Sequence, residues 1–205
     1  MNGKILNKIP ISGTNIEKHF GEIASTNLWI EFENDNYEKW YASFAKEYDK
    51  GFNTLIIDNI NNTAFISAGA QGYLIDLSTK ELLLQTEKYQ SILSAIYSEK
   101  YNLIIFSSFW KIYIFNGRYL IKEIKPVDVD GIYFTDCSDN IAFGHVEEIL
   151  ARHPNIVFEL NLLNFELKYH REKINEPWGR KGFEEKKERD KNKKSFMDKL
   201  KSLFK

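Results

Sequence analysis

Residues 102–124 read NLIIFSSFWKIYIFNGRYLIKEI, and this stretch predicts short β-strands joined by tight turns. Positions 103–106 are all apolar, which indicates a strand buried on both faces, as happens where sheets stack on sheets. Asn116-Gly117 predicts a type I′ hairpin turn, because both central residues of that turn need positive φ. The stretch is therefore typical of antiparallel β-structure with more than one layer.

The same pattern of short strands and turns occurs three times from residue 54 onward. Asn62, Asn102 and Asn140 open the middle strand of each copy, 40 and then 38 residues apart. The copies lie near 54–86, 92–125 and 131–169. A period of about 40 residues is close to that of four-stranded propeller blades.

Two further strands are expected upstream, NLWIEF at 27–32 and KWYASFA at 39–45, as an earlier and incomplete blade. Three copies and a fragment fall short of the four to eight blades that close a propeller. We therefore expect a mainly β fold, an antiparallel meander of stacked hairpins that is half-propeller-like. An ordinary twisted meander or a sandwich is the alternative. A short inserted helix is expected at 147–154, EEILARHP.

The charge is uneven along the chain. Residues 171–205 hold 13 basic and 7 acidic side chains, whereas residues 1–170 hold 15 basic and 22 acidic ones. We expect a single β-rich domain over 1–170 and a basic tail over 171–205, whose end, SFMDKLKSLFK, predicts an amphipathic helix. That helix could dock on the acidic body, fray, or touch a membrane surface. An acidic body favours basic partners and disfavours nucleic acid.

Composition and motifs favour a cytoplasmic protein without enzymatic activity. Residues 1–20 lack the apolar run of a signal peptide or membrane span, and the single cysteine, Cys137, agrees with a reducing compartment. SAGAQG at 67–72 lacks the lysine and helix of a phosphate loop, so it reads as a strand connection. Acidic neighbours make the Cys137 thiol a poor nucleophile.

A metal centre is not expected either. His145 and His153, with Glu147 and Glu148 beside the first, are the only loose cluster of ligands, and they lack converging metal-ligand spacing. We expect no cofactor, no metal and no catalytic residue. An enzyme whose residues converge only in three dimensions, such as His145, a carboxylate and Cys137, stays open as an alternative.

The three repeats resemble blades of WD-type propellers over roughly residues 54–169, although the Trp-Asp and Gly-His signatures of that family are absent. The whole chain is similar in style to bacterial immunity proteins of the contact-dependent inhibition type. That resemblance implies a one-to-one complex with a cognate toxin, commonly a basic nuclease, whose active site the acidic protein covers. The rival is an adaptor or scaffold subunit that pairs through open sheet edges, with another chain or with a second copy.

Seven residues are candidates for partner binding. Carboxylates would replace substrate phosphates at a cationic cleft, and aromatic side chains would supply central anchors. The candidates are Asp130, Asp136, Asp139, Glu147 and Glu148 for charge, with Phe109 and Trp110 as anchors. The competing interpretation is that the acidic residues are only solvated and the two aromatic residues belong to the sheet core.

Overall fold

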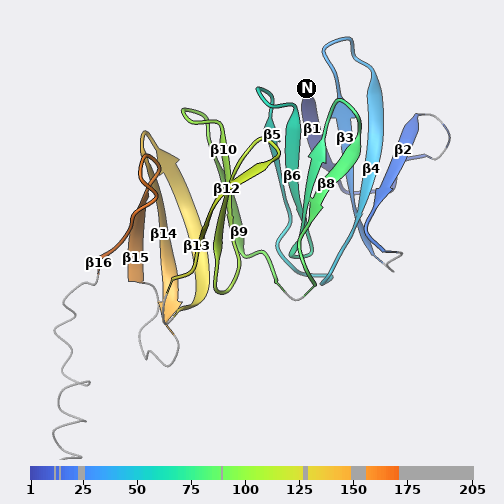
Figure 1. The fold of residues 1–205 in the computed structure, drawn as a ribbon. Coiled ribbons are helices and arrows are strands. Elements are labelled where there is room, and N and C mark those ends of the chain that lie inside the picture. Colours follow the sequence, from blue (N-terminus) through green and yellow to red (C-terminus); the bar gives the residue numbers. More distant parts are fainter. Residues whose placement is uncertain are drawn as a thin grey trace, which may run out of the picture. The chain divides into compact units, whose positions relative to one another are not determined.

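Sixteen β-strands in four sheets make up the regular structure of the computed structural model (Figure 1). The structure describes residues 1–170, apart from 12, 14, 23–25, 89, 127–128 and 149–155. The chain divides after His170 into two units, and only the first is described. No helix occurs among the described residues. The prediction of a mainly β, antiparallel fold is confirmed.

Each sheet has four strands. The first contains β1 (Asn2–Leu6), β2 (Ile16–Phe20), β3 (Asn27–Glu33) and β4 (Lys39–Ala45). The second contains β5 (Thr54–Asp58), β6 (Thr63–Ala68), β7 (Gln71–Asp76) and β8 (Glu81–Gln85). The third contains β9 (Ser94–Ser98), β10 (Leu103–Ser107), β11 (Ile112–Asn116) and β12 (Tyr119–Ile124). The fourth contains β13 (Val129–Ser138), β14 (Ile141–Glu148), β15 (Ile156–Asn161) and β16 (Leu167–His170).

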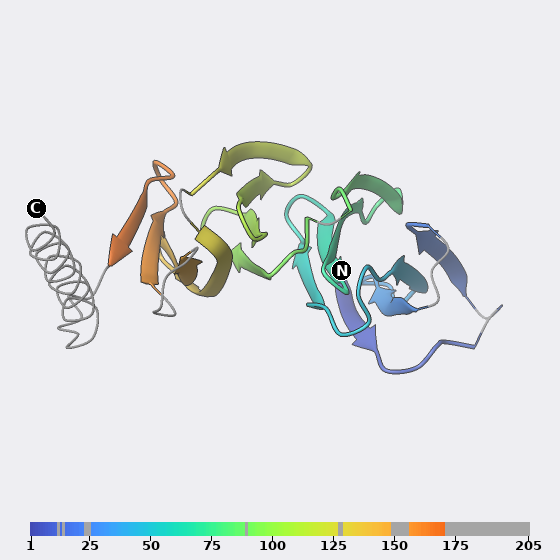
Figure 2. The same cartoon turned by 90° about the horizontal axis from the view of Figure 1, so that it is seen from below.

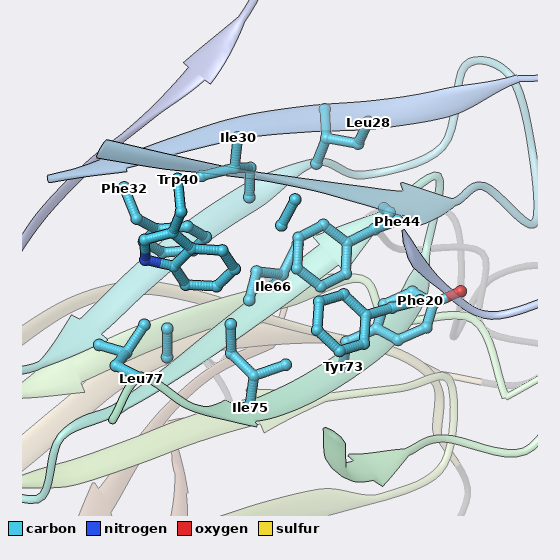
Figure 3. Packing of buried hydrophobic residues seen from close by; sticks show 13 residues of the cluster. Phe20, Leu28, Ile30, Phe32, Trp40, Phe44, Ile66, Tyr73, Ile75 and Leu77 are labelled. Carbon is cyan, nitrogen blue, oxygen red and sulfur yellow. The ribbon is translucent and has the colours of Figure 1, made fainter. Parts of the chain in front are cut away.

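The sheets follow one another in chain order, and three apolar layers hold them together. The first layer, between the first and second sheets, includes Phe44 and Tyr73 (Figure 3). The second layer stacks Phe65 of the second sheet on Phe106 of the third, with ring centroids 4.3 Å apart. The third layer joins the third sheet to the fourth around Phe158. Burial of apolar area in these layers is the main driving force of the fold.

Strand burial follows from the position of each sheet in this stack. Every residue of β6, β7 and β10 is buried, because the second and third sheets have a neighbour on both faces. In β3 and β15 buried and less buried residues alternate, because the first and fourth sheets have a described neighbour on one face only. The run at 103–106 was therefore correctly interpreted as a strand covered on both sides.

Two turns differ from expectation in their chemistry. Asn116 pairs with Tyr119, so the central residues of that turn are Gly117 and Arg118, and of these only Gly117 has positive φ, at 53°. This is the pattern of a type II′ turn, not the expected type I′. The type I′ pattern occurs instead at Gly69 and Ala70, both with positive φ, inside the SAGAQG segment that was interpreted as a strand connection.

Two further expectations from the sequence, the incomplete N-terminal blade and the inserted helix, differ from the structure. The upstream fragment is a full sheet with strand order β1-β3-β4-β2, in which β2 runs parallel to β4. The expected helix at 147–154 is wrong for its first two residues, because Glu147 and Glu148 end β14. Its remaining residues, and the expected C-terminal helix, lie outside the described residues.

Candidate functional site

The outer face of the fourth sheet is the candidate site. We use this name for the face of β13–β16 that points away from the third sheet. Figures 1 and 2 show β13–β16 at one end of the described strands. The inner positions Ile132, Phe158 and Leu160 fill the third apolar layer, which leaves the alternate positions for the outer face. No other described element packs on that face.

Two rows of side chains cross the outer face from β13 to β16. Strand register aligns Tyr133, His145, Val157 and His170 in the first row. Thr135 is the extra residue of a bulge between Phe134 and Asp136, and the bulge turns the Asp136 side chain to the outer face. The second row is therefore Asp136, Phe143, Glu159 and Lys168. Bulges re-aim side chains in this way because they insert one extra residue into a strand.

The first row is partly apolar and accessible. The Tyr133 and His145 rings stack with centroids 5.0 Å apart and an angle of 15° between their planes. Val157, next in the row, is 49% exposed. At the end of the row, His170 Nε2 lies 3.1 Å from Glu159 Oε1, without the alignment of a hydrogen bond. A stacked aromatic pair beside an exposed aliphatic side chain is the kind of surface that anchors protein partners.

Carboxylates surround this apolar centre. Glu147 pairs with Gly131 across the strands and is exposed, as is Asp130. Partial burial, followed by the charges of Glu147 and Asp130, raises the pKa of the Tyr133 hydroxyl. Residues 129–170 hold seven acidic and two basic side chains, whereas residues 1–128 hold 15 and 13. Most of the acidic excess of the body therefore belongs to the fourth sheet and its connections.

The outer face of the first sheet, at the other end of the chain order, differs in character. Glu31 accepts hydrogen bonds from Lys39 at 3.0 Å and from the Tyr41 hydroxyl at 3.1 Å, and it pairs with Lys4 at 3.0 Å. Burial alone would raise the pKa of Glu31, but these three partners lower it. His19 Nδ1 lies 2.6 Å from the Ser43 hydroxyl. Polar groups here satisfy one another, as on the capping surface of a repeat protein.

The structure gathers only some of the predicted binding residues. Asp130, Asp136 and Glu147 lie on the fourth sheet, beside or within the two rows. Asp139 lies in the β13–β14 turn with a positive φ of 49°, beyond the end of the rows. Glu148 ends β14, and its side chain lies outside the description.

The two predicted anchors belong elsewhere. Phe109 and Trp110 lie in the β10–β11 turn of the third sheet and not on the outer face of the fourth. Their ring centroids are 5.8 Å apart, and Trp110 is 54% exposed. Neither residue belongs to the apolar layers. The competing interpretation, in which both belong to the sheet core, therefore does not hold for the exposed Trp110.

Sequence reasoning missed Tyr133, Phe143, Val157, Glu159 and His170. The signal that could have found them is alternation. His145 and Glu147 flank Val146 in β14, and Glu159 and Asn161 alternate with Phe158 and Leu160 in β15, unlike the continuous apolar runs of the second and third sheets. A sheet whose strands alternate has one uncovered face, and the residues on that face are candidates for binding.

Chemistry at this end of the chain is limited among the described residues. Burial, and to a lesser extent the charge of Asp136, raises the pKa of the Cys137 thiol. In the described part, no three His, Cys, Asp or Glu side chains are placed to hold a metal ion. His153, part of the cluster weighed from sequence, lies outside that part. None of the described segments is a helix with the length and apolarity to cross a membrane.

Comparisons with known proteins identify no family. No protein-family model and no curated protein matches the chain. Among solved structures, the chain is similar to Kuenenia stuttgartiensis hydrazine synthase, with a TM-score of 0.38 and 16% identity over 53% of this chain and 32% of that chain. It is also similar to the extracellular domain assigned to a one component system of B. thetaiotaomicron, with a TM-score of 0.45 and 12% identity over 75% of this chain and 23% of that chain. The chain thus spans about a third or less of the length of either structure.

Proposed function

We propose that this protein is a non-catalytic binding module whose outer face on the fourth sheet docks a cationic protein partner. The observation that supports this most is the pairing of an accessible aromatic and aliphatic row, Tyr133-His145-Val157, with a local excess of carboxylates. Interfaces commonly combine an aromatic centre with a charged rim, because the centre supplies affinity and the rim steers the encounter.

The specific form of the proposal is an immunity protein that neutralises a cognate bacterial toxin by covering its active site. A basic nuclease presents a cationic cleft, and in this proposal the carboxylates of Asp130, Asp136 and Glu147 occupy the positions of substrate phosphates there. Resemblance to the immunity class and the acidic fourth sheet support this form. We also propose that the sheets are arranged as the blades of a partly open propeller. The three four-stranded meanders β5–β8, β9–β12 and β13–β16 support this arrangement. The order β1-β3-β4-β2 departs from it.

A rescue experiment tests the proposal. The product of the adjacent upstream gene would be expressed in bacteria with and without the full chain, and survival counted. We expect survival with the wild-type chain, and loss of survival when Asp136→Lys and Glu147→Lys are combined. The matched control combines Glu17→Lys and Glu33→Lys on the first sheet, where we expect full rescue. Equal rescue by both double variants, or an upstream product without toxicity, would contradict the toxin assignment.

A scaffold that pairs through sheet edges is the second candidate. The exposed apolar side chains of the edge strand β12 favour it. This edge strand exposes Tyr119 by 69%, Leu120 by 49% and Ile121 by 44%. An exposed apolar edge is a template for adding a strand from a second chain. Ile121 is, however, the extra residue of a bulge against β11, and bulges obstruct such pairing. Light scattering on the purified full chain would show a stable homodimer if β12 pairs with itself, and a monomer otherwise.

A further inference from the structure

A second site lies away from the fourth sheet, in a pocket of about 670 Å³ beside the first two sheets. Its lining comes from β4 and the turn before it, the approach to β2, and the β7–β8 turn. Pockets that bind small molecules commonly measure about 300–1,000 Å³ and combine apolar walls with a few polar groups. Here Ile16, Tyr37 and Leu77 supply apolar surface, and Trp40 and Lys80 supply hydrogen-bond donors.

Trp40 brings an unused donor to this pocket. Its side chain is 3% exposed and stacks on Phe32, with ring centroids 4.4 Å apart and 15° between the planes. The indole Nε1–H has no hydrogen-bond partner. Figure 3 shows the nitrogen on the edge of the ring that faces away from Phe44 and Tyr73. A buried indole usually finds a partner, because leaving a buried donor unpaired destabilises the folded state.

Lys80 places a cation over the same ring. Its ammonium lies 5.7 Å from the centroid of Trp40, and the residue has a positive φ of 59° at the end of the β7–β8 turn. In the described part of the chain, no carboxylate or carbonyl pairs with this ammonium. Lys39, also in the lining, is by contrast held by Glu31 and Glu33 at 3.0 and 3.2 Å. The pocket therefore combines the unpaired indole donor of Trp40 with the Lys80 ammonium, which forms no ion pair among the described residues.

We propose that this pocket binds a small organic acid through its carboxylate. The two carboxylate oxygens accept from the Trp40 indole N–H and the Lys80 ammonium, while the apolar body lies against Tyr37, Leu77 and Ile16. One carboxylate matches two donors and one positive charge, whereas the Glu38 side chain in the lining disfavours a dianion such as phosphate. Nε1 is itself covered, so entry of the ligand requires neighbouring side chains to move.

Nuclear magnetic resonance on the full-length ¹⁵N-labelled protein tests this proposal. The chain has four tryptophans, so its indole signals are few, and the Trp40→Phe variant identifies the one from Trp40. Sodium benzoate is the probe, and benzamide is its neutral analogue of the same shape. We expect a saturable shift of the Trp40 indole signal with benzoate and a far weaker response to benzamide.

Two lysine variants decide whether the charge is the cause. Lys80→Met keeps the aliphatic stem over Trp40 and should weaken benzoate binding by about tenfold, the effect of losing one charge-assisted hydrogen bond. Lys122→Met, on exposed β12 outside the pocket, should leave it unchanged. No saturable shift with benzoate, an equal response to benzamide, or unchanged affinity in Lys80→Met would each overturn the proposal.

Discussion

The Ser107 hydroxyl donates a hydrogen bond of 2.6 Å to the Ile132 carbonyl and so joins the third sheet to the fourth. Ser94 extends the contact, because its hydroxyl lies 2.7 Å from that of Ser107 and accepts from the Phe134 amide at 2.8 Å. Both serines are buried. A polar bridge inside an apolar interface fixes the position of β13 against β9 and β10, since each buried group needs its partner.

Replacing Ser107 should loosen that bridge. Ser107→Ala leaves the Ile132 carbonyl without this buried donor, so we expect the free energy of unfolding to fall by about 1–3 kcal/mol. Urea unfolding followed by tryptophan fluorescence measures the change. Ser138→Ala, an exposed serine at the end of β13, is the control and should change stability by less than about 0.5 kcal/mol. Equal losses would mean that the bridge contributes nothing.

Gly144 in β14 should not tolerate a methyl group. A Cβ at this position would lie 2.3 Å from the Tyr133 carbonyl oxygen and 2.5 Å from the Phe158 ring. We expect Gly144→Ala to destabilise by about 1–3 kcal/mol, because backbone and a buried ring would have to shift. In Gly3→Ala the three nearest atoms are side-chain carbons of Ile57, Leu55 and Phe32 at 2.9–3.2 Å, and none is backbone, so a smaller loss is expected in the same unfolding assay. A larger loss for Gly3→Ala would contradict this packing.

Alkaline pH should weaken the contact between the second and third sheets. The Tyr97 hydroxyl donates to Asp58 Oδ1 at 3.1 Å, and burial, then the charge of Asp58, raises the pKa of Tyr97 to about 12. In the unfolded chain this pKa is about 10. Because the pKa in the folded protein is higher, the protonated Tyr97 hydroxyl contributes fully to the free energy of unfolding below about pH 10. This contribution is lost as the pH rises through about 12.

Comparing wild type with Tyr97→Phe isolates this contribution from those of Tyr73 and Tyr113, whose pKa values burial also raises to about 12. The variant should be less stable than wild type near neutral pH, and the difference should shrink between about pH 10 and about pH 12. Urea midpoints over that pH range measure it. A difference that stays constant with pH would show that the Tyr97 proton is not coupled to folding.

The sequence was sufficient to predict the sheets whose strands are strongly apolar. Runs such as 103–106 predicted strands buried on both faces, because consecutive apolar side chains point to opposite faces of a sheet and both faces must then be covered. β1 and β2 escaped prediction for the converse reason. NGKIL and IEKHF each mix charge with short apolar stretches, and their strand conformation depends on pairing with β3 and β4. Tertiary context decides such segments, and local propensity does not.

The candidate face was predictable only in part. Counting carboxylates located the acidic fourth sheet, and Asp130, Asp136 and Glu147 do lie there. The predicted aromatic anchors, Phe109 and Trp110, lie in the β10–β11 turn and stay a prediction, whereas the aromatic residues of this face were missed because exposure of an aromatic residue on a strand depends on whether its sheet has a neighbour. Phe143 and Tyr133 lie on the terminal sheet, whereas Phe106 has the same kind of side chain and is 1% exposed between two sheets. Linear sequence shows the strands but not which sheet ends the stack.

Calorimetric titration of the full chain with the product of the adjacent upstream gene measures most directly whether the outer face of the fourth sheet is a recognition surface. We predict a one-to-one complex that Glu147→Lys weakens by about tenfold or more, while Glu17→Lys, the same charge reversal on the first sheet, leaves the affinity within about twofold. The absence of a complex, or equal weakening by both variants, would contradict the assignment of binding to this face.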